Sequence, residues 1–244
     1  WGAYQAYGDE RYRFPVPDNV ARGDESYVHY SHLLADLDMI CARISGASRD
    51  DRAYYAKWLD RLERIGASPL LDRPEVREAL GRARSQLGQM DPAIGHYRAA
   101  LSMETGGLTL RAMEQLANLE VRHGAKLAES DATQAGAAAQ LMEAGHRRLE
   151  QLLAIGETAE RLSLLGSYWK RMALLKARPR GLPDVDACIV GFKEAYGRAV
   201  ELSYRRDGTR DYYPLLNALD GAFLAAVRGT GEAMAAERVR ELAD

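Results

Sequence analysis

Apolar residues recur at spacings of three and four along almost the whole chain, from Glu25 towards its C-terminal end. This spacing places apolar side chains on one face of an α-helix. The periodic stretches are short, and glycines such as Gly46, Gly66, Gly88 and Gly124 follow them in the manner of helix-ending residues. The pattern predicts about ten helices of ordinary length, joined mostly by short loops.

The clearest internal repeat covers Pro74–Glu104, a helix pair with small residues at Gly81 and Ala93 and an aromatic residue at Tyr97. Small residues let the two helices of a pair cross closely, and the aromatic ring fills the space between successive pairs. The pattern resembles the tetratricopeptide repeat (TPR), a unit of about 34 residues. The resemblance implies that the helix pairs stack into an α-solenoid.

Three weaker copies of this pattern begin at Met113, Thr158 and Tyr212, with insertions between their helices that depart from the family's spacing. The predicted fold class is therefore all-α, a right-handed α-solenoid of TPR-like helix pairs over residues 23–244. A short extended or strand segment with a proline-containing linker is predicted over residues 1–22, because proline prevents a continuing helix.

The aromatic-rich segment at residues 1–14 carries a second resemblance. Its first four residues, WGAY, and the later Gly8 and Asp9 resemble the C-terminal edge of the CHAT domain, a caspase-like cysteine peptidase domain often joined to TPRs in bacteria. The resemblance implies that the segment is the last strand of a preceding CHAT domain in a larger signalling or defence protein. The catalytic His and Cys of that family lie upstream of this strand, so no residue of the chain matches them.

Charge and hydropathy exclude several classes of partner. Lys and Arg number 33 and Asp and Glu 35, so the net charge is -2 and the whole chain has no electrostatic attraction to nucleic acid or anionic lipid. No apolar run approaches the roughly 18 residues that a membrane helix requires. The two cysteines form no disulfide framework, which favours a reducing compartment. We expect a cytoplasmic protein that binds neither nucleic acid nor membranes.

Motifs for catalysis and cofactor binding are absent: the sequence has no GxxxxGK[ST], GxGxxG, GxSxG or HExxH. His29, His32 and Asp36 share one helix face and have metal-ligand chemistry, but a solvated helix face is the favoured interpretation. Cys41 and Cys188 lie in apolar series and are interpreted as buried structural residues. We predict no catalytic residue, no metal and no cofactor. The remaining histidines are expected on the surface: His96, His123 and His146.

The first helices of the repeats in a TPR array line a concave surface. The repeat pattern directs basic and amide side chains, with one serine, toward this groove. Such a lining suits an acidic peptide or a C-terminal carboxylate, which it binds through charge-assisted hydrogen bonds. Ordinary solvated positions are the alternative interpretation. The predicted groove residues are Arg82, Gln86, Asn118, Arg122, Ser167, Lys170 and Arg171.

These observations favour a non-catalytic interaction or regulatory module that binds a protein or peptide. The parent's own peptidase domain is one partner to consider, through Trp1–Phe14. An oligomerisation scaffold is an alternative. A helical enzyme with an unrecognised site is a weaker one, supported only by the scattered His and Cys residues.

The repeat register makes a prediction about stability. Tyr97→Ala and Trp169→Ala are each expected to lower the free energy of unfolding by about 3–5 kcal/mol where the ring is fully buried. Denaturant melts measure this loss, and a loss below about 1 kcal/mol for a buried ring would show that the register is wrong.

Overall fold

The structure is a computed structural model that describes residues 27, 29–64, 69–103, 108–177, 185–208 and 211–229. The predicted extended segment over residues 1–22 lies outside this part of the chain. Within it the structure has nine α-helices, one short 3-10 helix and no strand. The helices are α1 (Tyr30–Ile44), α2 (Arg49–Arg64), α3 (Pro74–Gln86), α4 (Met90–Leu101), α5 (Leu110–Ser130), η1 (Ala132–Gln134), α6 (Ala135–Ile155), α7 (Ala159–Lys176), α8 (Val185–Asp207) and α9 (Tyr212–Arg228).

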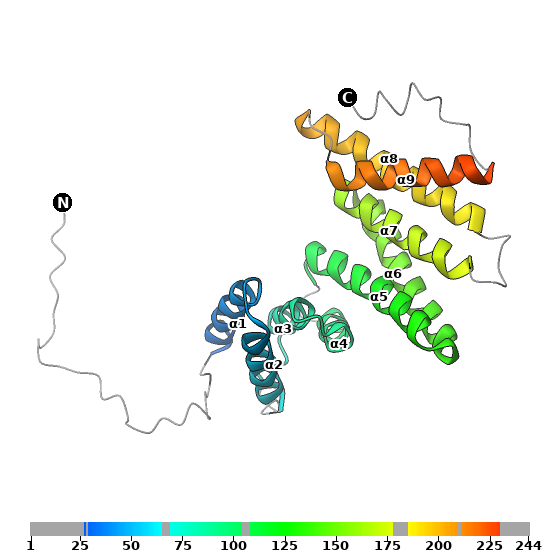
Figure 1. The fold of residues 1–244 in the computed structure, drawn as a ribbon. Helices are drawn as coiled ribbons and strands as arrows, with labels where there is room; N and C mark the ends of the chain where they lie inside the picture. The colour runs from blue at the N-terminus through cyan, green and yellow to red at the C-terminus, as the bar shows by residue number, and fades with distance from the viewer. Residues whose placement is uncertain are drawn as a thin grey trace, which may run out of the picture.

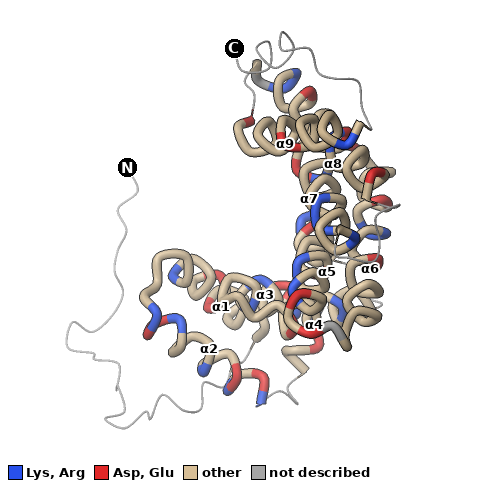
Figure 2. The backbone as a smooth tube through the Cα atoms, turned by 45° about the vertical axis from the view of Figure 1, so that its right-hand side comes forward, with Lys and Arg blue, Asp and Glu red and all other residues tan. Residues whose placement is uncertain are grey.

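Helices α3 and α4, α5 and α6, and α7 and α8 form three successive antiparallel pairs, and α9 packs on α8 (Figure 1). The first helices of neighbouring pairs also touch, since α5 contacts both α3 and α7. Figure 2 shows that the stack runs along a bent path from α1 and α2 at one end to α9 at the other. Within the described residues, this arrangement confirms the predicted all-α fold of TPR-like helix pairs.

Glycines set the close approach inside the pairs. A Cβ on Gly81 of α3 would lie 3.1 Å from the ring of Tyr97 on α4. A Cβ on Gly166 of α7 would overlap the ring of Tyr196 on α8. Tyr97 is only 2% exposed and belongs to the apolar cluster that includes Leu116 of the next pair, as its predicted position between pairs requires.

The expectation that Gly124 ends a helix is wrong. Helix α5 continues through it to Ser130. A Cβ on Gly124 would lie 2.6 Å from Cγ of Met142 and 2.7 Å from the carbonyl oxygen of Ala138, both on α6. A Cβ on Gly145 of α6 would likewise lie 2.7 Å from the carbonyl oxygen of Ala117 on α5. These two glycines therefore allow α5 and α6 to pack at short distance along their length.

A fully buried carboxylate joins three consecutive helices. Glu120 of α5 is 0% exposed, and its oxygens accept hydrogen bonds from Nε of Arg98 on α4 at 2.9 Å and Nε of Arg148 on α6 at 3.0 Å. A buried charge without such partners would cost several kcal/mol. Glu120 therefore specifies which helices lie around α5.

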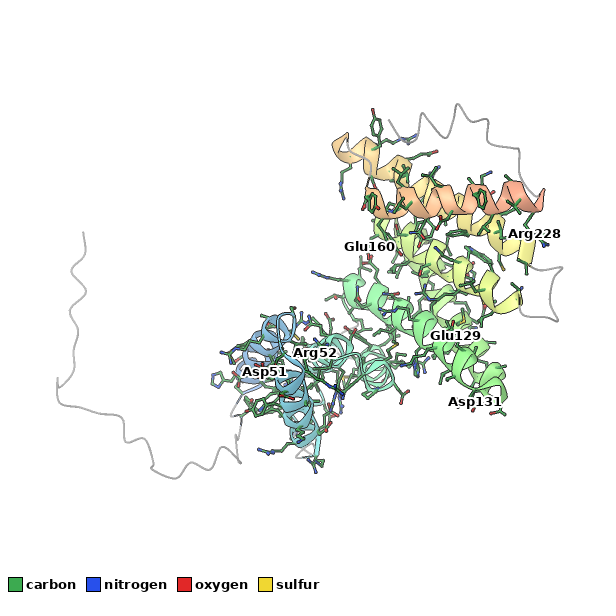
Figure 3. The ribbon with its side chains drawn as sticks, in the orientation of Figure 1. Asp51, Arg52, Glu129, Asp131, Glu160 and Arg228 are labelled. Carbon is green, nitrogen blue, oxygen red and sulfur yellow. The ribbon has the colours of Figure 1, made fainter. Side chains whose placement is uncertain are left out.

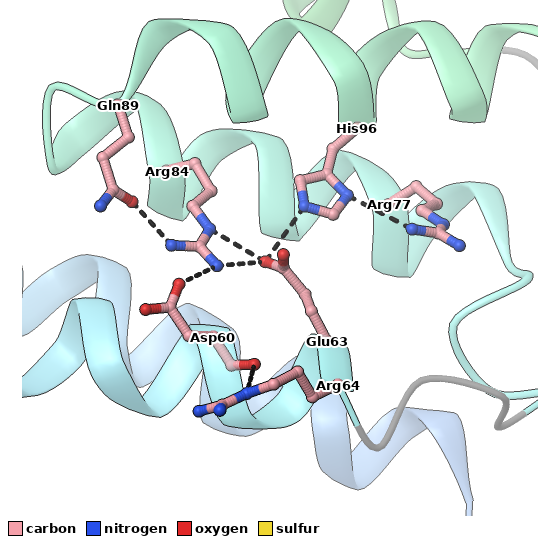
Figure 4. Close-up of polar contacts among 7 residues, drawn as sticks. All are labelled: Asp60, Glu63, Arg64, Arg77, Arg84, Gln89 and His96. Carbon is pink, nitrogen blue, oxygen red and sulfur yellow. Dashed lines mark hydrogen bonds and ion pairs between the residues drawn. The ribbon is translucent and has the colours of Figure 1, made fainter.

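A second ionic network attaches α2 to the first TPR-like pair (Figure 4). Nε of Arg84 on α3 donates to Oε1 of Glu63 on α2 at 2.9 Å, and its Nη2 lies 2.8 Å from Oδ1 of Asp60. His96 of α4 approaches the same Glu63 oxygen through Nε2 at 3.1 Å. The expectation of a surface position for His96 is wrong, because α2 covers it and leaves it 8% exposed.

The glycine contacts predict opposite outcomes for the same substitution at two sites. Gly166→Ala should lower the free energy of unfolding by about 1–3 kcal/mol, because its methyl group meets a buried ring that cannot withdraw. Gly197→Ala on α8 should raise it by about 0.5–1 kcal/mol, because nothing lies within 4 Å of its Cβ and alanine favours helix. Denaturant melts compare the two, and equal effects would contradict the proposed close contact.

The Glu63 network predicts a response to acid. Burial on its own raises the pKa of Glu63, but hydrogen bonds from His96 and Arg84 outweigh it and hold the pKa below its ordinary value of 4.5. Since the folded-state pKa is the lower one, ionised Glu63 stabilises the fold above the unfolded-state pKa. This stabilisation is lost as pH falls through the folded-state pKa.

Glu63→Gln should therefore reduce stability at neutral pH by about 1–3 kcal/mol and make it less sensitive to acid. Thermal melts between neutral pH and about pH 3 test this. The matched control is Glu194→Gln, which removes an exposed carboxylate of α8. A wild type and Glu63→Gln variant with parallel pH profiles would contradict the prediction.

Candidate ligand-binding groove

The predicted groove residues lie on the first helices of three successive pairs, as the repeat pattern requires. Each of them lines a pocket on these helices. Helix α3 carries Arg82 and Gln86, α5 carries Asn118 and Arg122, and α7 carries Ser167, Lys170 and Arg171.

The first of these pockets lies between α5 and α7, near the start of α9, and has a volume of about 320 Å³. Four predicted residues line it: Asn118, Arg122, Ser167 and Arg171. The other polar residues of its wall include Glu160, Ser163, Asp211 and Tyr213.

An adjoining pocket of about 480 Å³ lies further along the same helices. It shares Arg122, Ser167, Arg171 and Tyr213 with the first pocket. We call the two together the central groove. Glu160 lines only the first pocket and Glu129 only the second, and Figure 3 labels both residues. The second pocket adds Lys126, Lys170, Tyr196 and Asn217.

Arg82 and Gln86 line a separate, smaller pocket between α3 and α5, with a volume of about 210 Å³. The Arg82 guanidinium forms an ion pair with Asp38 of α1. The structure thus divides the predicted residues into two sets. Five lie together in the central groove. The other two lie on α3, and the only cation of these two, Arg82, is already paired with Asp38.

The cations of the central groove differ in how far the protein neutralises them. Nζ of Lys170 donates to Oδ1 of Asn217 at 2.9 Å and lies 3.4 Å from Oδ2 of Asp220, both on α9. Arg122 is exposed and has no ion-pair partner among the described residues. Arg171 is half-buried, and burial, followed by repulsion from Arg122, holds the pKa of its guanidinium below the ordinary value.

Sequence reasoning missed the contribution of α9. Tyr213 lines both pockets of the central groove, and its hydroxyl lies 3.2 Å from that of Tyr196. Asp211 fixes the start of α9 by accepting a hydrogen bond from the backbone N–H of Tyr213 at 3.0 Å. Aspartate is a common residue at the start of a helix, so Asp211 before the two tyrosines could have predicted where α9 begins.

The other chemically reactive residues have structural surroundings. Nδ1 of His29 accepts from the backbone N–H of Ser31 at the start of α1, and Asp36 accepts from the Tyr27 hydroxyl at 2.9 Å. No group of three or more metal-ligating side chains comes together within the described ranges. Cys41 and Cys188 are both buried, and burial raises the pKa of the Cys41 thiol.

In the part of the chain that the structure describes, no helix combines the length and apolar character needed to cross a bilayer. Figure 2 shows Lys and Arg positions along α5 and α7, the two helices that carry most of the central groove. The arrangement can therefore bind an anionic or hydrogen-bonding ligand along a surface built from three helix pairs.

Comparison with known proteins agrees with this architecture. Among curated proteins no relative matches the chain, and no solved structure matches it. The family described as TPR-S, Tetratricopeptide Repeats-Sensor, matches residues 89–225, which is more than half of the 244 residues. The matched range runs from the start of α4 into α9 and includes every residue of the central groove. The chain belongs to the TPR-S family of tetratricopeptide-repeat proteins.

Proposed function

We propose that this chain is a non-catalytic sensor module that binds an acidic peptide segment, or a peptide C-terminal carboxylate, in its central groove. The observation that carries the proposal is the pair Arg122 and Arg171. Both line both pockets, and neither has a carboxylate partner among the described residues. Cations held without a partner at a concave surface attract an anionic ligand.

The groove also supplies neutral hydrogen-bonding groups. Asn118, Ser163 and Ser167 line the first pocket, and Asn217 lines the second. An extended peptide needs such groups, because its backbone N–H and C=O groups lose hydrogen bonds to water on binding. The groove thus combines charge for attraction with amides and hydroxyls for alignment.

The proposal extends to the role of the module in a larger protein. TPR arrays recognise other proteins in general, and the family description includes the word sensor. Together with the CHAT-like pattern at residues 1–14, this supports a regulatory arm that restrains or positions a caspase-like peptidase. Co-expression of the chain with such a peptidase domain tests the role. Association lost on deletion of residues 1–14, with an unchanged melting temperature of the helical array, is the expected result.

Groove binding itself makes a sharper prediction. A fluorescent peptide rich in Asp and Glu should bind the wild type with an affinity that falls as salt rises, because the attraction is electrostatic. Arg122→Glu should weaken binding by about tenfold or more, since it replaces a charge-assisted hydrogen bond with like-charge repulsion. Fluorescence anisotropy measures both effects.

The matched control is Arg147→Glu, which makes the same charge reversal at an exposed position of α6 that lines neither pocket of the central groove. Its affinity should stay close to that of the wild type. If the two variants lose affinity equally, the peptide responds to overall charge and the central groove is not the site.

A further inference from the structure

Two arginines belong to the wall that the two pockets of the central groove share. It consists of Arg122, Ser167, Arg171 and Tyr213, contributed by α5, α7 and α9. Two guanidinium groups therefore face the same space from two different helices. Beyond this shared wall, the first pocket includes Glu160 and the second includes Glu129.

The two most deeply buried arginines of the described fold are both paired with carboxylates. Arg84 is 3% exposed and contacts Glu63 and Asp60, and Arg161 is 6% exposed and contacts Glu114 at 2.7 Å. Arg171 is half-buried, but among the described residues it donates hydrogen bonds only within its own helix, to the backbone oxygen and the hydroxyl of Ser167. Part of the Arg171 fork is therefore left to bind something else.

The groups around Arg171 do not compensate for its burial. Arg122 repels it, whereas Glu129 and the hydroxyls of Tyr196 and Tyr213 act in the opposite direction more weakly, so that the pKa of Arg171 remains lowered by burial and by Arg122. Two neighbouring guanidiniums in a partly desolvated wall raise the free energy of the empty groove. An anion placed between them would remove this repulsion.

We propose that Arg122 and Arg171, with the hydroxyl of Ser167, form a subsite for one oxyanion, a carboxylate or a phosphate group, at the centre of the ligand. This inference rests on the proposed function of the groove and names the part of the ligand that it recognises. Guanidinium groups suit the subsite because their planar forks bind carboxylate and phosphate oxygens in pairs. The Ser167 oxygen accepts from Arg171, and its hydroxyl also interacts with that of Tyr196, so donation to the oxyanion would replace the contact with Tyr196.

Carboxylates in the unshared parts of the two pockets restrict where the ligand carries charge. Glu160 and Asp211 line the first pocket, and Glu129 lines the second. These carboxylates repel further negative charge on either side of the subsite. Among acidic ligands the preferred one therefore has its negative charge at the subsite, and negative charge spread along the whole peptide adds less affinity per residue.

The test uses synthetic peptides with blocked ends and neutral flanks, which differ only at the central residue: phosphoserine, glutamate, serine or glutamine. The wild type should bind each charged peptide about tenfold or more tightly than its neutral counterpart. This preference should fall below about twofold in Arg122→Gln and in Arg171→Gln, and persist in the control Arg147→Gln. Circular dichroism melts confirm that each variant folds.

Two further arms separate the sources of the oxyanion. A neutral peptide with a free C-terminal carboxylate tests the chain terminus, and inorganic phosphate tests a free anion through the melting temperature. Phosphate should raise the melting temperature of the wild type and of Arg147→Gln more than that of Arg122→Gln or Arg171→Gln, because it relieves repulsion that the latter two variants lack.

The outcomes distinguish the subsite from the groove. If the wild type binds charged and neutral peptides equally well, or if the preference survives in both arginine variants, the subsite is overturned while peptide binding stands. If no peptide binds but phosphate stabilises the wild type through Arg122 and Arg171, the subsite stands and the ligand is a small oxyanion. If neither peptide nor phosphate has an effect, both proposals are overturned.

Discussion

The contact between a glycine on one helix and an aromatic ring on its partner determines how closely the helices of a pair approach. Gly81 with Tyr97 sets this distance in the first TPR-like pair, and Gly166 with Tyr196 sets it in the third. The second contact also reaches the groove, because the Tyr196 hydroxyl lies 3.2 Å from that of Tyr213. The same ring therefore fixes the pair and positions a residue that lines both pockets of the central groove.

Charges between the helices are paired inside the fold, whereas two arginines of the central groove have no carboxylate partner among the described residues. Glu120 is enclosed by two arginines from neighbouring helices, and Glu114 accepts from Nε of Arg161 at 2.7 Å. Desolvated ions require such partners, so these arginines are committed to the architecture. Arg122 and Arg171 lie outside these networks, which is why the proposed function assigns them to ligand binding.

The repeat spacing was sufficient to predict the TPR-like pairs and to place the groove residues on the first helices, because spacing along a helix decides which residues share a face. It was not sufficient for Gly124. Gly88 follows α3 with a positive φ of 80°, whereas Gly124 lies within α5 against Met142. His96 was misplaced for a related reason, since its burial depends on α2, a helix distant in sequence.

The N-terminal helices α1 and α2 supply carboxylates that pair with basic side chains of the first TPR-like pair. Asp38 of α1 neutralises Arg82, and Glu63 of α2 is bound to Arg84 and His96, so the α1–α2 pair satisfies cations on the first TPR-like pair. A ligand that reached Arg82 would have to displace Asp38, whereas at the centre of the groove it meets guanidiniums without a carboxylate partner among the described residues. The positions along the first helices therefore differ in how strongly they attract an anion. Under the proposed function, the centre of the groove is therefore the favoured position for an anion, and the end beside α1 is the less favoured one.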